Sequence, residues 1–190
     1  MVRRNENERS VYALGAADGA TVGVLMGLCM MCMVLAVRVE WLSVVGLVLV
    51  VATPFVVWTM LRRAWVWGYT PPTFSAVWLH GICIYLFGSL IMALIFYVTL
   101  RFGVPDWIEM QTEEAVRRLS ADPSTAEQGR TLQLIIEHGD LPTPIYTAVS
   151  AIWLVAFTGS LCSMCFALIL TKTRLYRMQR DNYIANSTNG

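Results

Sequence analysis

The chain has 190 residues, of which 56% are hydrophobic and 14% are charged, and its mean hydropathy is +0.56. This composition is too apolar for an ordinary soluble domain and too poor in charge for a disordered chain. A formal net charge of +1 creates no basic field for nucleic acid, which excludes nucleic acid as a partner. We therefore expect one compact unit embedded in a lipid bilayer.

Four long apolar runs predict an all-α, polytopic membrane protein. They cover about residues 13–37, 41–61, 74–100 and 145–170. Each is long enough for a helix that crosses a bilayer, which needs roughly 20 residues. Pro54 lies inside the second run and is expected to kink it. Arg62 and Arg63 are expected to end the second helix, before a loop that contains Pro71 and Pro72.

Three polar segments complete the predicted organisation. They are an N-terminus at residues 1–10, a loop between the third and fourth spans at residues 102–143, and a basic tail at residues 171–190. Inside the loop, Pro105-Asp106 predicts the start of one short amphipathic helix. Asp122, with Ser124 and Glu127 as a capping box, predicts the start of a second helix, which the sequence around Gly139 should end. The loop therefore forms a small helical cap.

Basic residues are distributed unequally between the two ends of the predicted spans. The N-terminus, the Arg62-Arg63 loop and the tail carry three, two and four. The turn at Arg38 carries one, and the long loop carries four when Arg101, just before it, is included. Loops rich in lysine and arginine stay in the cytoplasm. The pattern predicts a membrane protein with both termini in the cytoplasm and residues 102–143 outside.

Small residues recur at a fixed spacing in the first span. The glycines are Gly15, Gly19, Gly23 and Gly27. A spacing of four places them on one face of a helix. Each costs roughly 1 kcal/mol of helix propensity relative to alanine, whereas in lipid a row of small residues lets a second helix approach closely. We expect this glycine face to pack against another helix, of the same chain or of another.

The third span and the loop after it resemble a known family. The residues that carry the resemblance are Gly81, Gly88-Ser89-Leu90, Ala93, Tyr97-Val98-Thr99-Leu100-Arg101-Phe102 and Pro105-Asp106-Trp107-Ile108. Over about residues 10–172 the chain resembles the four-helix bacterial membrane proteins of domain-of-unknown-function family 4199. The resemblance implies no activity and no catalytic residues. It implies one partner by gene association, a family-2 glycosyltransferase of the polyprenyl-phosphate type.

Asp18 and His80 are the only acid and the only histidine inside the predicted spans. Ionisable groups in a membrane are functional candidates by default. Counting at 1.5 Å per residue places both about 28–30 Å from the outer boundary, at the cytoplasmic edge. Three interpretations follow: each side chain reaches interfacial water, the two form a structural pair, or they belong to a proton or ion path.

Cysteines and methionines offer weaker candidates. Cys29-x-x-Cys32 and Cys162-x-x-Cys165 have the spacing of zinc ligands, but the two pairs should lie about 10–15 Å apart along the membrane normal. We interpret them as small packing residues, and the methionines near Met30 as adaptable packing. No metal site, cofactor or catalytic set is expected.

The last candidates form a basic cluster after the fourth span. They are Lys172, Arg174, Arg177 and Arg180. These residues either contact anionic lipid headgroups or act only as a stop-transfer signal at the end of the span. Taken together, the sequence favours a non-catalytic membrane subunit that scaffolds or anchors a partner, or that forms a homo-oligomer. The alternative hypothesis is a small transporter or channel that uses Asp18 and His80.

Overall fold

The structure is a computed structural model that describes residues 11–66, 73–122 and 124–188. Over these residues it contains helices and no strand. The helices are α1 (Val11–Leu35), α2 (Trp41–Val66), α3 (Phe74–Val98), a π-helical turn η1 (Thr99–Gly103), α4 (Trp107–Ala121), α5 (Ala126–His138) and α6 (Pro144–Thr188). The predicted all-α fold is confirmed.

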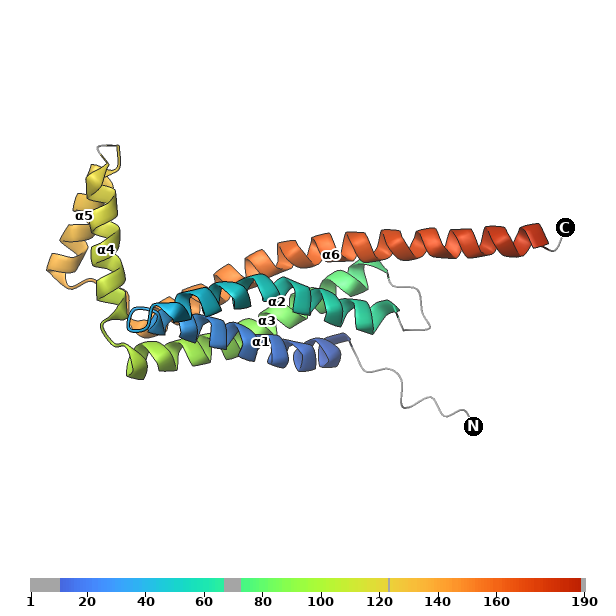
Figure 1. Cartoon of the computed structure of the whole chain (residues 1–190), viewed down its shortest axis with the longest axis horizontal. Coiled ribbons are helices and arrows are strands. Elements are labelled where there is room, and N and C mark those ends of the chain that lie inside the picture. The colour runs from blue at the N-terminus through green and yellow to red at the C-terminus, as the bar shows by residue number, and fades with distance from the viewer. Residues whose placement is uncertain (1–10, 67–72, 123, 189–190) are drawn as a thin grey trace.

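Four of these helices run side by side as an elongated bundle (Figure 1). The segments that are long and apolar enough to cross a membrane are Tyr12–Leu35, Trp41–Trp65, Phe74–Gly103 and Pro144–Thr173. A helix satisfies its own backbone hydrogen bonds, which is what the interior of a bilayer requires. The chain is therefore a multi-pass membrane protein, as the four apolar runs predict.

Helix α3 is the centre of the bundle. It packs along α1 on one side and along α6 on another, while α2 contacts mainly α1. Half of the most apolar segment of α3 is buried, against 17% of that of α6 and 22% of that of α2. Helices α2 and α6 touch each other only sparsely. The two therefore flank an incompletely filled space.

Two helix ends differ from the sequence prediction. Helix α2 continues through Arg62 and Arg63 to Val66, and α6 continues past residue 170 to Thr188. Arginine favours helix almost as strongly as alanine and can extend its charge into water from an apolar stem. A basic residue therefore ends the membrane span without ending the helix. The loop residues Pro71 and Pro72 lie outside the described residues.

The second half of α6 extends beyond the other helices (Figure 1). Its apolar segment ends at Thr173, and the remaining 15 residues to Thr188 add about 22 Å at 1.5 Å per residue. Lys172, at the start of this extension, has an exposed side chain. Arg174, Arg177 and Arg180 lie on the extension, and their side chains are outside the described part of the chain. Their assignment to lipid headgroups stays a prediction.

Helices α4 and α5 form a hairpin that projects sideways from the opposite end of the bundle (Figure 1). The two helices pack closely where Gly129 meets Ser120: a Cβ added to Gly129 would lie 2.7 Å from the Ser120 hydroxyl oxygen. The chain leaves α5 through Gly139, whose φ of 73° is readily adopted only by a residue without a Cβ. The predicted helical cap is thus a two-helix hairpin.

The predicted capping box at the start of α5 is wrong. The Asp122 carboxylate accepts hydrogen bonds from the Ser124 backbone N–H at 2.9 Å and from the Ser124 hydroxyl at 2.8 Å. This local turn uses the Ser124 hydroxyl, and the helix starts later, with Thr125 preceding it. The Thr125 hydroxyl donates to the Leu119 carbonyl at 2.8 Å, which ties the turn to α4.

Candidate functional site

The glycine face of α1 packs directly on α3 of the same chain. A Cβ added to Gly23 would lie 2.7 Å from the carbonyl oxygen of Gly88 and 2.9 Å from its Cα. A Cβ added to Gly19 would lie 2.9 Å from the carbonyl oxygen of Ile84. In the middle of this interface the two backbones nearly touch, as small residues allow in membrane helices.

The two outer glycines meet side chains rather than backbone. Gly15 faces Cys83 and the ring of His80, and Gly27 faces Ile95. The whole face is therefore used inside one chain. At its Gly15 end, the face brings α1 close to α3 beside Asp18 and His80.

Asp18 and His80 are brought together by this packing. The His80 Nε2 atom lies 3.2 Å from the Asp18 Oδ2 atom. The histidine side chain is fully buried, while the Asp18 side chain is 31% exposed. Nε2 makes no well-aligned hydrogen bond, so the contact is an electrostatic pair with imperfect geometry. Because the His80 side chain is completely buried, it does not reach interfacial water. Its contact with Asp18 is the arrangement expected of a structural pair.

Trp65 is a third member of this site that the sequence did not single out. Its indole N–H donates to the Nδ1 atom of His80 at 3.0 Å. An imidazole nitrogen that accepts a hydrogen bond carries no proton, so a neutral His80 holds its proton on Nε2, facing Asp18. The site is thus an ordered chain from Trp65 on α2, through His80 on α3, to Asp18 on α1. It ties three helices together at one end of the bundle.

The hydroxyls of Ser89 and Thr99, further along the chain from this site, are bonded locally. The hydroxyl of Ser89 donates to the Leu86 carbonyl, and that of Thr99 to the Ile95 carbonyl, both at 2.8 Å. These bonds stay within α3 and use the one proton that each hydroxyl can donate. Neither of these two hydroxyls therefore has a free proton to offer to a relay from His80 toward the other end of the bundle.

The cysteines of the two C-x-x-C motifs are free thiols and do not gather into one metal-binding cluster. Cys29 is buried, and its thiol donates to the Gly46 carbonyl at 3.3 Å, whereas Cys162 and Cys165 are exposed on α6. Across residues 11–66, 73–122 and 124–188, no cluster of three or more His, Cys, Asp or Glu side chains could hold a metal ion. Cys32 is half-buried.

One acid on the hairpin, Glu114, is paired with two arginines of the same helix. Glu114 accepts a hydrogen bond from Arg118 at 2.9 Å and pairs with Arg117 at 2.9 Å. The hydrogen bond from Arg118, together with the nearby charges, lowers the pKa of Glu114 below its usual range. At this exposed position the pairs are screened by water and stabilise the hairpin only slightly. Glu114 is therefore held in surface ion pairs on α4.

Comparisons with known proteins agree with the fold. The model of the family described as "Protein of unknown function (DUF4199)" matches residues 18–172. No curated protein and no solved structure matches the chain. The match extends from Asp18, at the polar site, to Lys172, at the end of the fourth span. The chain therefore belongs to the DUF4199 family.

Proposed function

We propose that the protein is a non-catalytic membrane subunit that scaffolds or anchors a partner protein. The observation that carries this proposal is the α4–α5 hairpin. Apart from Gly129, no residue in its two helices is buried. The first turn of α4 packs Trp107 and Ile108 against the bundle, but beyond it so little of the hairpin is buried that it is marginal on its own, because most helix stability in proteins comes from packing. A partner that covers the hairpin would supply this packing.

The hairpin offers both apolar and charged contacts to such a partner. Leu134 and Ile135 on α5 are 53% and 38% exposed, beside exposed acids such as Glu127 and Glu137. Residues 102–143 contain eight acids and three arginines, a net charge of 3 − 8 = −5. We expect a partner surface that combines an apolar patch with basic residues, since complementary charge favours encounter and register.

Helix α6 supports the same proposal inside the membrane. Trp153, Leu154 and Phe157 are 75%, 65% and 67% exposed. These side chains suit contact with lipid and equally with a transmembrane helix of a partner. The family resemblance suggests a polyprenyl-phosphate glycosyltransferase as that partner, or another envelope-assembly protein. A second copy of the chain is the alternative occupant.

The hairpin can be tested directly by co-purification. We expect a stoichiometric membrane protein to co-purify with the full chain in mild detergent and to be lost from a Leu134→Glu, Ile135→Glu double variant. Gln128→Glu, an exposed polar position on the same helix, is the matched control and should retain it. If the double variant keeps its partner, the hairpin is not the docking surface. Purification of the chain only as a homo-oligomer would contradict the proposal that its partner is a different protein.

The proposed orientation places both termini in the cytoplasm of a bacterial inner-membrane protein. A reporter that is active only outside the cytoplasm should be active when fused after Ser124, within the hairpin. Fusions after Arg63 and Arg180 should be silent, because these positions follow the more basic ends of the spans. An active Arg63 fusion, measured with protein levels matched by immunoblotting, would reverse the orientation.

The alternative function, a small transporter, is favoured only by the Asp18–His80 contact. If the protein is a scaffold, Asp18→Asn and His80→Gln should both support growth of a deletion strain at matched protein levels. Each variant keeps hydrogen-bonding groups but removes a proton-binding site, so a proton-coupled transporter should lose activity in both. Behaviour like the deletion in either well-expressed variant would favour transport over scaffolding.

A further inference from the structure

A cavity of about 330 Å³ lies within the bundle, near the middle of the membrane-crossing helices. Its wall includes Met26 of α1, Pro54 of α2, Tyr85 of α3 and Thr158 of α6, each close to the centre of its span. The residues that line it include no Asp, Glu, Lys, Arg or His. Its volume is at the lower end of the range typical of small-molecule sites, about 300–1,000 Å³.

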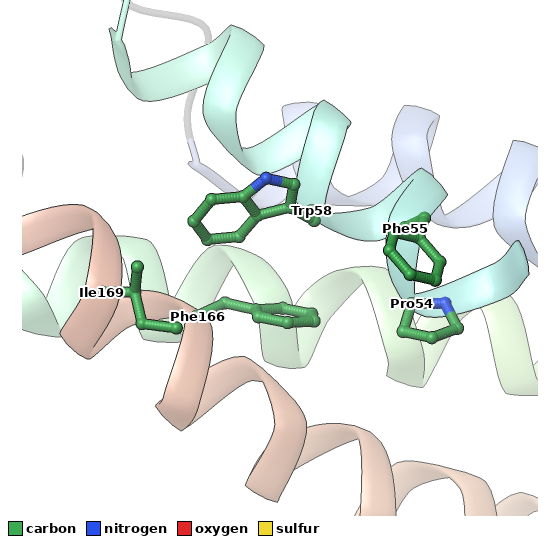
Figure 2. Close-up of a pocket in the computed structure, with 5 residues that line it drawn as sticks. All are labelled: Pro54, Phe55, Trp58, Phe166 and Ile169. Carbon is green, nitrogen blue, oxygen red and sulfur yellow. The ribbon is translucent and has the colours of Figure 1, made fainter. Parts of the chain in front are cut away.

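The cavity adjoins a groove on the membrane-facing side of the bundle. This groove, of about 350 Å³, is lined by Pro54, Phe55, Trp58, Phe166 and Ile169. Figure 2 shows Trp58 of α2 and Phe166 of α6 facing each other across the space between the two helices. Their ring centroids are 5.5 Å apart. Pro54 lines both spaces, so the route from the groove to the cavity passes between α2 and α6.

One hydrogen-bond donor on the cavity wall stands without a partner. Tyr85 is only 6% exposed, and across the described residues its hydroxyl makes no hydrogen bond. The other hydroxyls on the wall are used, since Thr53 donates to the Leu49 carbonyl and Thr158 to the Leu154 carbonyl, both at 2.8 Å. The Tyr85 ring is buried while the residue lines the cavity, and a tyrosine hydroxyl in apolar surroundings usually finds a partner because leaving it unpaired is costly.

We infer that this cavity binds a neutral, lipid-soluble molecule with a carbonyl oxygen that accepts a hydrogen bond from Tyr85. The ligand is neutral because the wall offers no opposite charge. It carries an acceptor because the Tyr85 hydroxyl, which can both donate and accept, has no acceptor for its proton among the described residues. It enters from the bilayer between α2 and α6. A plain hydrocarbon chain, or the apolar face of another helix, would leave the Tyr85 hydroxyl unsatisfied.

The wall is suited to a ligand of irregular shape. Met26, Met30 and Met92 all line the cavity, and methionine side chains are flexible and polarisable. Gly159 allows the Tyr85 ring to lie directly against the backbone of α6, because any Cβ at this position would collide with the ring. The glycine thereby fixes the tyrosine while the methionines adapt. The inference does not depend on the proposed scaffold function.

Two kinds of neutral membrane lipid carry such a carbonyl oxygen: a quinone carries it on its ring, and a glyceride carries it in its ester groups. The full chain in phosphatidylcholine nanodiscs should be titrated with decylubiquinone, with dioctanoylglycerol and with tetradecane, which has no carbonyl. We expect saturable binding of one carbonyl probe. Tyr85→Phe keeps the ring and removes the hydroxyl, and should weaken that binding about three- to tenfold, the range for one hydrogen bond.

Tyr146→Phe removes an exposed tyrosine hydroxyl on α6, a helix that borders the cavity, and is the matched control for Tyr85→Phe. A second variant, Val155→Trp, fills the cavity from α6 and should abolish binding of the carbonyl probe while circular dichroism shows an intact helical fold. Preference for decylubiquinone assigns a quinone, and preference for dioctanoylglycerol assigns a glyceride. The inference is overturned if neither carbonyl probe binds saturably, or if Tyr85→Phe binds like the unmodified chain.

Discussion

Gly23→Leu should lower the melting temperature of the protein in mild detergent by several degrees. The first added atom, Cβ, would already lie 2.7 Å from the Gly88 carbonyl oxygen and 2.9 Å from its Cα. Both are backbone atoms in the middle of α3, which cannot rotate out of the way. Overpacking of this kind typically costs about 1–3 kcal/mol, and we expect the upper end here because α1 and α3 must separate.

The position of the substitution, rather than its size, should decide the outcome. Ala17→Leu adds a large side chain to an exposed position of the same helix and should leave the melting temperature unchanged. Gly27→Leu should have an intermediate effect, because the nearest obstacle is the end of the flexible Ile95 side chain. Thermal unfolding followed by circular dichroism would measure all three variants. Equal melting of the Gly23→Leu and Ala17→Leu proteins would contradict the close contact.

The glycine face shows what helical periodicity can and cannot predict. The four-residue spacing identifies a face on α1, because side-chain direction repeats every 3.6 residues. It says nothing about which helix lies opposite, since that depends on contacts between segments distant in sequence. The partner residues Gly88 and Ile84 carry no spacing signal of comparable strength. The choice between packing within a chain and between chains therefore required the structure.

The polar site was predictable only in part. Depth counting placed Asp18 and His80 at one level, which made a pair possible, but it could not show that His80 is completely buried. Trp65 follows Arg62 and Arg63, and the sequence suggests that it lies in a loop beyond the span. Because α2 continues to Val66, the indole stays on the helix and reaches His80. An error of a few residues at a helix end thus hid the third member of the site.

The cavity was not predictable from the sequence at all. Its wall combines residues from four helices, and its existence depends on the sparse contact between α2 and α6. Met26 and Met30 stood out only as a methionine-rich patch, which is consistent with ordinary packing. Tyr85 gave no signal, because an unpartnered hydroxyl is a property of the folded arrangement and not of a residue type.

His80→Leu should destabilise the protein more than any conservative change at the same site. Leucine has no nitrogen, so it removes both the acceptor for the Trp65 indole and the group that faces Asp18. Loss of a partner for a buried polar group typically costs about 1–3 kcal/mol. His80→Gln should cost less, because an amide oxygen can accept from Trp65 while the amide nitrogen donates toward Asp18. Thermal melting in detergent would rank the two variants.

A double-mutant cycle with Trp65→Phe would separate the Trp65–His80 hydrogen bond from simple packing. Once the indole N–H is gone, His80→Leu should cost less than in the unmodified protein, with a coupling energy of about 0.5–3 kcal/mol. Ser89→Ala is the control, because Ser89 is also fully buried but bonds only within its own helix. Two results together would contradict this role: a His80→Leu protein that melts no lower than the Ser89→Ala protein, and additive effects in the cycle. They would show that the interactions from Trp65 to Asp18 do not hold the three helices together.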